Sequence, residues 1–200
     1  MRRPRVALTR RATAVAATLS VALLAQGCAT QETQGTREYL DEHTAATITV
    51  ASKNLVFARG RPEFAVNARD YLTIVPVDVN RAGKHVLYFY CYAWSTVDKQ
   101  RAATESPGQF ELVADGRQIS LAPATSQPHD LGFGELPITA PALTYQTIVV
   151  STTRETLQFL TRSQQVFALR TRDGLNERFD VWEDGRAALG ELLHGGSGTR

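Results

Sequence analysis

Cysteine and lysine are scarce in this chain of 200 residues, and the familiar catalytic motifs are missing from it. The sequence has two cysteines, Cys28 and Cys91, so it contains no paired C-x-x-C metal or redox motif. It also contains no G-x-S-x-G, H-E-x-x-H or phosphate-loop pattern, so no standard hydrolase motif indicates an enzyme. Three lysines stand against 19 arginines, a bias typical of a GC-rich genome, and we infer no nucleic-acid role from it.

The sequence also lacks an apolar run long enough to span a bilayer comfortably. Its longest uncharged apolar run, "ATAVAATLSVALLA" at residues 12–25, has 14 residues. The 11 residues before this run carry five arginines and no acidic residue. A basic segment followed by a short apolar run is typical of a signal peptide, so we expect residues 1–27 to lie outside the folded domain.

The residues that follow the apolar run, "QGCAT", resemble the lipobox of bacterial lipoproteins. Residues 25–27 fill the places before the cysteine, and Leu24 lies one position earlier than the usual pattern has it. The resemblance implies that Cys28 is joined to diacylglycerol through its sulfur and becomes the mature N-terminus. Because Ala29 rather than aspartate follows, it further implies an outer-membrane location facing the periplasm. An ordinary secretory signal cleaved nearby, with Cys28 incidental, is the alternative.

Loss of residues 1–27 would change the charge of the protein. Removing five arginines from 22 basic residues leaves 17 against 20 acidic residues, a formal charge of −3. A mature chain of this charge has no global attraction to nucleic acid or to anionic membrane surfaces. The expected membrane contact is therefore the lipid anchor, with another envelope protein as the expected partner.

A single β-rich domain is expected behind this signal, because 200 residues are typical of one domain. We assign residues 28–44 to the lipidated cysteine and a polar tether, residues 45–194 to the domain, and residues 195–200 to a flexible tail. If Cys28 carries lipid, Cys91 is the remaining thiol, and its place within an apolar strand predicts a buried, inert side chain.

The sequence of the domain predicts mainly short strands joined by hairpin turns. Residues 70–80, "DYLTIVPVDVN", alternate in polarity and should pair with the apolar run 85–97, although Pro76 requires an edge, bulge or bend. Asp115-Gly116 predicts a tight hairpin turn. Residues 152–163 and 183–193 have helical spacing, with Thr152 and Glu155 as a capping box. We therefore expect an α+β domain that is mainly antiparallel β, a sandwich-like or curved sheet of about nine strands with two short late helices.

The run "HVLYFYCYAWSTV" at residues 85–97 places large aromatic rings on one face of a strand. Alternation puts Leu87, Phe89, Cys91 and Ala93 on the other face. Three interpretations are open for the aromatic face. It packs in the core under one or both late helices, it binds a ligand such as a sugar, or it docks a protein. The candidate ligand-binding residues on this face are Tyr88, Tyr90, Tyr92 and Trp94.

The proline-rich connection at residues 122–142 carries a second candidate site. His129 and Asp130 are adjacent there and Glu135 follows, so this loop has the side chains to act as an acid and base or to hold a metal. Polar residues in loops are more often only solvated, and we expect neither a metal nor a cofactor.

The sequence thus predicts a lipid-anchored cell-envelope protein whose β-rich domain binds or scaffolds another envelope component without catalysis. One alternative is a carbohydrate-binding module that uses the aromatic strand face. A second alternative is an envelope hydrolase that uses the 122–142 loop.

Overall fold

A computed structural model describes residues 32–33, 35–97, 108–122, 137–141 and 144–195. These residues belong to one compact unit, Gln31–Arg200. Within them, no helix has both the length and the apolar character needed to cross a membrane.

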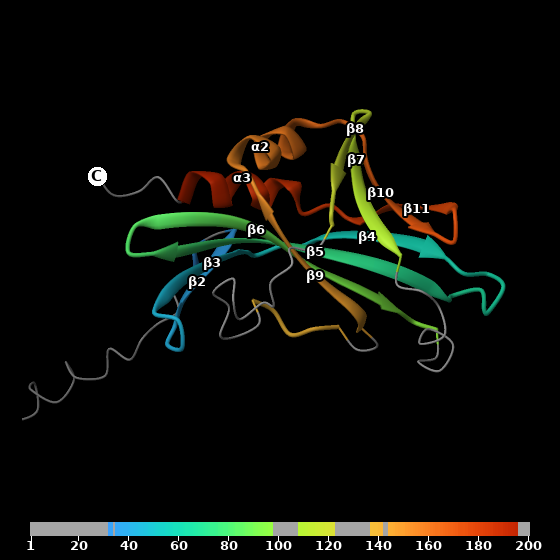
Figure 1. Cartoon of the computed structure of the whole chain (residues 1–200), viewed down its shortest axis with the longest axis horizontal. Coiled ribbons are helices and arrows are strands. Elements are labelled where there is room, and N and C mark those ends of the chain that lie inside the picture. Colours follow the sequence, from blue (N-terminus) through green and yellow to red (C-terminus); the bar gives the residue numbers. More distant parts are fainter. Residues whose placement is uncertain (1–31, 34, 98–107, 123–136, 142–143, 196–200) are drawn as a thin grey trace, which may run out of the picture. The chain divides into compact units, whose positions relative to one another are not determined.

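The described residues form one open, curved antiparallel sheet of eleven strands with two short helices late in the chain, so the predicted fold class is confirmed (Figure 1). The elements are β1 (Glu32–Thr33), β2 (Thr36–Asp41), β3 (Ala46–Ala51), β4 (Leu55–Gly60), β5 (Arg69–Arg81), β6 (Lys84–Ser95), β7 (Gln109–Ala114), β8 (Arg117–Ser120), β9 (Thr144–Thr152), α2 (Arg154–Arg162), β10 (Val166–Arg172), β11 (Leu175–Glu183) and α3 (Arg186–Gly195).

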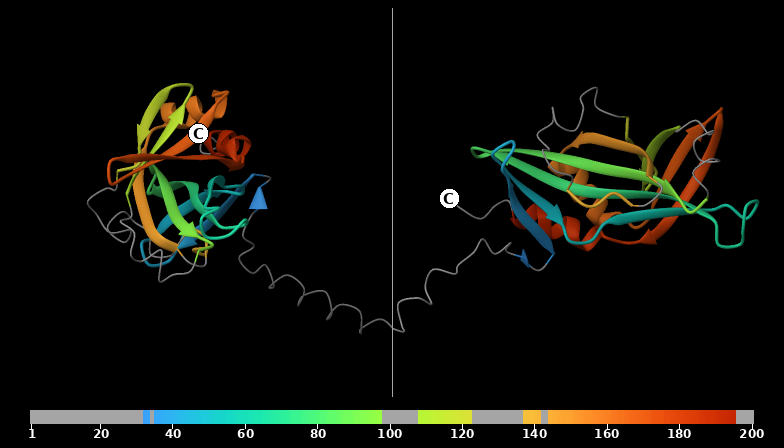
Figure 2. Two further views of the ribbon diagram at one scale, coloured as in Figure 1. Left: turned by 90° about the vertical axis from the view of Figure 1, so that its right-hand side faces the viewer. Right: turned by 90° about the horizontal axis from the view of Figure 1, so that it is seen from below.

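The sheet branches at the long strand β5. On one side β5 pairs with β6, which pairs in turn with β9. On its other side β5 pairs with β4 over residues 69–74 and with β3 over residues 77–80. The β3 branch continues to β2 and β1, and the β4 branch continues through β11, β10 and β7 to β8. Figure 2 shows the second branch curling back over the β5–β6 part of the sheet.

Pro76 lies where β5 changes partner. On the β3–β4 side, pairing with β4 ends at Ile74 and pairing with β3 begins at Val77. Proline has no backbone N–H to donate, so it fits this gap between two partners at little cost. The expected irregularity at Pro76 is therefore a branch point of the sheet.

Three hairpins close with a residue pair in the left-handed backbone region. Asp115 and Gly116 have φ values of 45° and 81° between β7 and β8, which confirms the predicted turn. Ala82–Gly83 and Asp173–Gly174 make the corresponding turns of the β5–β6 and β10–β11 hairpins. The Asp115 carboxylate also accepts from the backbone N–H groups of Gln164 and Gln165, which ties this turn to the start of β10.

Strand β2 forms inside the segment that the sequence assigned to a tether. Its residues, "TREYLD", are mostly polar, so composition gave no sign of a strand. They pair with β3 over Thr36–Asp41, and Tyr39 packs on the apolar cluster behind β3. The sheet thus begins before residue 45, because backbone hydrogen bonds to a neighbouring strand are available whatever the side chains.

The two helices cover the face of β6 that carries Cys91. Leu157 and Leu160 of α2 and Leu189 of α3 join one cluster with Phe89 and Cys91. This placement differs from the core-packing interpretation of the tyrosine face, in which one or both late helices cover the tyrosines. The N-cap of α2 is Thr153, one residue after the expected Thr152, and its side chain accepts from the Thr156 N–H.

The tyrosine face forms a second, separate core. Tyr88, Tyr90 and Tyr92 cluster there with Val149 and with residues of β3 and β5. Ile138 and Ala140, from the segment 137–141, pack against the same cluster. Both faces of β6 are therefore buried, as the double apolar pattern of residues 85–97 requires.

Candidate functional site

Three of the four aromatic residues predicted as a ligand surface lie in the interior. Tyr88, Tyr90 and Tyr92 are 7%, 1% and 1% exposed, and the Tyr92 hydroxyl donates to the Ile138 carbonyl at 3.1 Å. Their rings therefore offer no open face to a ligand. Trp94 is half-buried, and its indole N–H donates to Thr73 Oγ1 at 3.0 Å. Of the three interpretations of this face, core packing describes the part from Tyr88 to Tyr92.

Burial of these phenols predicts a loss of stability at alkaline pH. Burial raises the pKa of Tyr88, Tyr90 and Tyr92, and the charge of Tyr90 raises that of Tyr92 further. Above about pH 10 the unfolded chain releases these protons while the folded chain keeps them. The free energy of unfolding therefore has its full value below that pH and falls as the pH rises. Urea unfolding between about pH 9 and 11, with phenolate absorbance as a second probe, measures this loss.

Tyr90→Phe provides the control for this prediction, because phenylalanine has no proton to release. Its stability should decline less steeply with pH than that of the wild type. Equal slopes for the two proteins, or full phenolate absorbance before unfolding, would contradict the prediction.

The aromatic row opens to solvent at one end. Trp94 stacks on Tyr71 with ring centroids 4.0 Å apart and an interplanar angle of 9°. Tyr71 meets Trp182 edge to face at 6.0 Å, and the guanidinium carbon of Arg69 lies over the Trp182 ring, 4.9 Å from its centroid. Trp182 is 53% exposed, whereas Tyr71 is 8% exposed. We name these four residues, Arg69, Tyr71, Trp94 and Trp182, the Trp182 patch.

A bulge in β11 presents Trp182. Val181 pairs with Phe57 and Glu183 pairs with Val56, so Trp182 is an extra residue between two successive pairs of the β4–β11 ladder. Bulges of this kind re-aim a side chain and are frequent beside functional sites. Sequence reasoning named Trp94 but missed the rest of this patch, because Trp182 comes from β11, which is distant along the chain from β5 and β6. The sequence feature that could have indicated the patch was Trp182 itself, a tryptophan flanked by Val181 and Glu183.

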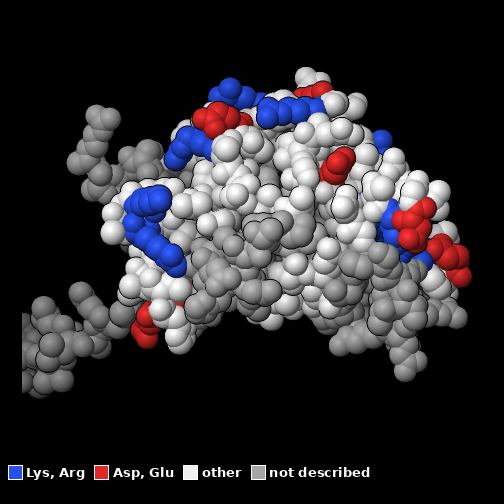
Figure 3. All heavy atoms as spheres, viewed as in Figure 1, with Lys and Arg blue, Asp and Glu red and all other residues white. Residues whose placement is uncertain are grey.

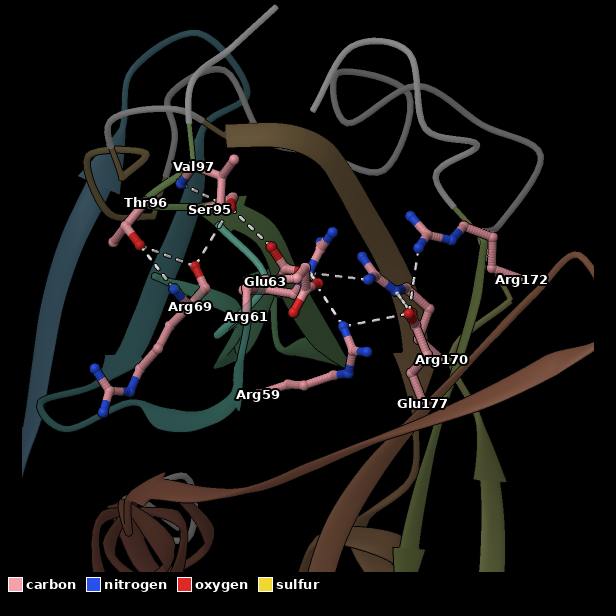
Figure 4. A network of polar contacts seen from close by, with 11 residues as sticks. Arg59, Arg61, Glu63, Arg69, Ser95, Thr96, Val97, Arg170, Arg172 and Glu177 are labelled. Carbon is pink, nitrogen blue, oxygen red and sulfur yellow. Dashed lines mark hydrogen bonds and ion pairs between the residues drawn. The ribbon is translucent and has the colours of Figure 1, made fainter. Parts of the chain in front are cut away.

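A network of arginines and carboxylates lies on the face of β5 opposite to the Trp182 patch (Figure 4). Asp70 is 2% exposed; its Oδ2 accepts from Arg61 Nη1 at 2.8 Å and from Arg170 Nη2 at 3.0 Å. Its Oδ1 accepts from the Ser95 hydroxyl at 2.7 Å. Arg170 is 1% exposed, and its guanidinium also lies over the Phe179 ring at 5.2 Å. Buried charges of this kind are stable only when paired in this way.

Glu177 extends the network toward the surface. It accepts from Arg170 and from Arg172, and it lies 3.3 Å from Arg59 Nη1. Gly108 packs directly on this network, since a Cβ there would lie 2.9 Å from Arg170 Cγ, and its φ is +74°. The network joins β4, β5, β10 and β11, the strands by which the second branch leaves the sheet. We interpret this network as a clamp that holds the curled branch in place, and we name it the Asp70 clamp, formed by Arg59, Arg61, Asp70, Arg170 and Glu177.

Two further polar features have a structural explanation. His85 Nδ1 lies 2.8 Å from Asp78 Oδ2 near the turn of the β5–β6 hairpin, a cross-strand pair with 41% of the His85 side chain exposed. A surface depression of about 580 Å³ lies between the start of β10 and α3, where Arg178 covers Phe167 and Arg186 pairs with Asp184. Among the residues that the structure describes, no group of three His, Cys, Asp or Glu side chains could hold a metal ion.

Cys28, His129, Asp130 and Glu135 lie outside the described residues, so their predicted roles stay predictions. Cys91 lies inside them and is fully buried in the helix-covered core, where burial raises the pKa of its thiol. A protonated, inaccessible thiol does not act as a nucleophile.

On the face shown in Figure 3, the described charged side chains lie in small groups near the outline, with uncharged side chains between them. Compared with protein-family models, with curated proteins and with solved structures, the chain matches none.

Proposed function

We propose that this protein is exported, anchored by lipid on Cys28 to the outer membrane facing the periplasm, and uses its β-rich domain to bind another component of the cell envelope without catalysis. The observation that carries the anchor is the order of features before residue 29. Five arginines, a 14-residue apolar run and a cysteine after a glycine follow one another there. The lipid would keep the domain near the membrane, and the polar residues after Cys28 would separate the two.

Geometry supports a binding role for the domain more than a catalytic one. The buried charges of Arg61, Asp70 and Arg170 are paired with one another in the Asp70 clamp. Cys91 is a buried, inert thiol. The Trp182 patch, by contrast, presents one exposed aromatic ring, that of Trp182, on a support of strands. Tryptophan, tyrosine and arginine are the residue types that dominate binding energy at interfaces.

The anchor is tested by labelling cells with a palmitate analogue and recovering the protein. We expect the wild type to carry the label and Cys28→Ser to lose it entirely and to accumulate at the length of the uncleaved chain. Mass spectrometry of the labelled protein should give a mature N-terminus at residue 28.

Cys91→Ser is the matched control, because it removes the other cysteine of the chain. The side chain of Cys91 is 0% exposed, so this variant should keep the label in full. An unlabelled wild-type protein that still begins at Met1, or label that survives Cys28→Ser, would overturn the proposal.

A further inference from the structure

We propose that the Trp182 patch binds a carboxylate-bearing glycan of the cell envelope. The inference rests on the proposed function for the compartment in which such a glycan is met, but the binding itself is a property of the folded domain. The patch differs from the strand face predicted from the sequence, because it includes Trp94 and excludes the buried Tyr88, Tyr90 and Tyr92.

The first argument is the exposed tryptophan on a rigid support. The exposed large hydrophobic residues of the described part are Leu40, Val66, Leu175, Val181 and Trp182, of which Trp182 is the aromatic one. It is backed by Tyr71, which is itself held by the parallel ring of Trp94. A ligand that stacks on Trp182 would therefore meet a preorganised surface and would lose little free energy to ordering it.

The second argument is the charge beside the ring. The backbone of Arg69 is fixed at the start of β5, where its N–H donates to Thr96 Oγ1 at 2.8 Å and its carbonyl accepts from the Thr96 N–H at 2.9 Å. Its guanidinium lies over Trp182 and donates to the Asn67 carbonyl at 3.4 Å. Among the residues described, no carboxylate lies within ion-pair distance of it, in contrast to Arg59, Arg61 and Arg170 across the sheet. Arg69 is thus available to a carboxylate of a ligand.

A sugar acid combines the two chemistries that the patch offers. One face of a pyranose ring consists of C–H groups and packs on an indole, while its carboxylate pairs with a guanidinium in a planar, bidentate geometry. A neutral sugar would use the tryptophan alone. An anion without an apolar face would use the arginine alone, and that contact is weak at an exposed site.

The test is calorimetric titration of the full chain, purified in detergent, with oligomers of galacturonic acid and with neutral galactose oligomers of equal length. We expect the wild type to bind the acidic oligomer more tightly than the neutral one. Trp182→Ala should raise the Kd for the acidic oligomer roughly 10-fold or more, as for other central aromatic anchors. Arg69→Gln should abolish the preference for the acidic oligomer while keeping residual binding of both.

Two matched variants control for surface changes elsewhere on the same strand. Leu175→Ala removes an exposed apolar side chain from β11, and Arg178→Gln removes an arginine that already pairs with Asp180. Both should bind as the wild type does.

Co-sedimentation with insoluble peptidoglycan repeats the comparison on an envelope glycan, and Trp182→Ala should reduce the fraction of protein that sediments with it.

The proposal is overturned if the wild type binds neither oligomer, if Trp182→Ala binds as well as the wild type, or if the patch captures a protein while it fails to bind glycan. These outcomes are distinct from failure of the anchor. A protein that loses the palmitate label but keeps Trp182-dependent binding would refute the anchoring and leave the glycan site standing.

Discussion

Replacing Asp70 by alanine is expected to destabilise the domain by about 3–5 kcal/mol, the range found when one partner of a buried ion pair is removed. Asp70 accepts from Arg61 and Arg170, which are 5% and 1% exposed. Without the carboxylate, two guanidiniums that water reaches poorly lose their shared partner. Urea unfolding followed by circular dichroism measures the effect as a lower midpoint at an unchanged slope.

The control for this prediction is Asp180→Ala, which removes the same side chain from an exposed pair. Asp180 and Arg178 bond at 2.7 Å, but their side chains are 72% and 60% exposed. An exposed pair contributes about 0–1 kcal/mol, so this variant should unfold nearly as the wild type does. Equal effects of the two substitutions would show that the Asp70 clamp does not hold the curled branch to β5.

The second large effect is expected from Leu160→Ala, which should cost about 2–5 kcal/mol. Leu160 is 0% exposed and lies in the same cluster as Phe89, Cys91 and Leu189. Its truncation leaves a cavity between α2 and the sheet, and the rigid sheet cannot collapse to fill it. Thermal and urea unfolding give the free-energy change.

Leu175→Ala is the matched control here, because Leu175 is 70% exposed and should contribute little to stability.

Cys91 offers an independent readout in a Cys28→Ser background. A thiol reagent reaches it only when the helix-covered core opens, so Leu160→Ala should accelerate labelling tenfold for each 1.4 kcal/mol lost. Rapid labelling of Cys91 in the otherwise unchanged protein would contradict the placement of the helices on this face.

The local parts of the fold follow from short-range patterns in the sequence. Asp115-Gly116 between two alternating runs predicts a hairpin because two successive residues must adopt positive φ, and the observed angles agree. The run from Val86 to Trp94 predicts a strand buried on both faces. Pro76 predicts an irregularity in β5. It does not predict that β5 changes partner there, because that change depends on where β3 and β4 pair, and the residue pattern within one strand does not show this.

The candidate site was only partly predictable. Trp94 belongs to both the predicted aromatic face and the Trp182 patch, whereas Tyr71 and Trp182 reach it from other strands. The sequence shows which side chains share a strand face, since alternation is a local property of the backbone. It does not show which end of that face stays open, because that depends on how β11 pairs with β4 and where the segment 137–141 packs.

By itself, then, the sequence determined most of the hairpins and strands, the late helices and the double burial of β6, since each depends on neighbours a few residues away. Only the tertiary structure decided that the helices cover Cys91 rather than the tyrosines, that Arg170 pairs with Asp70 across 100 residues, and that Trp182 ends the aromatic row in solvent. The physical reason is that these contacts depend on the curl of a branched sheet. That curl comes from the packing of two apolar faces at once, and no single segment of the chain encodes it.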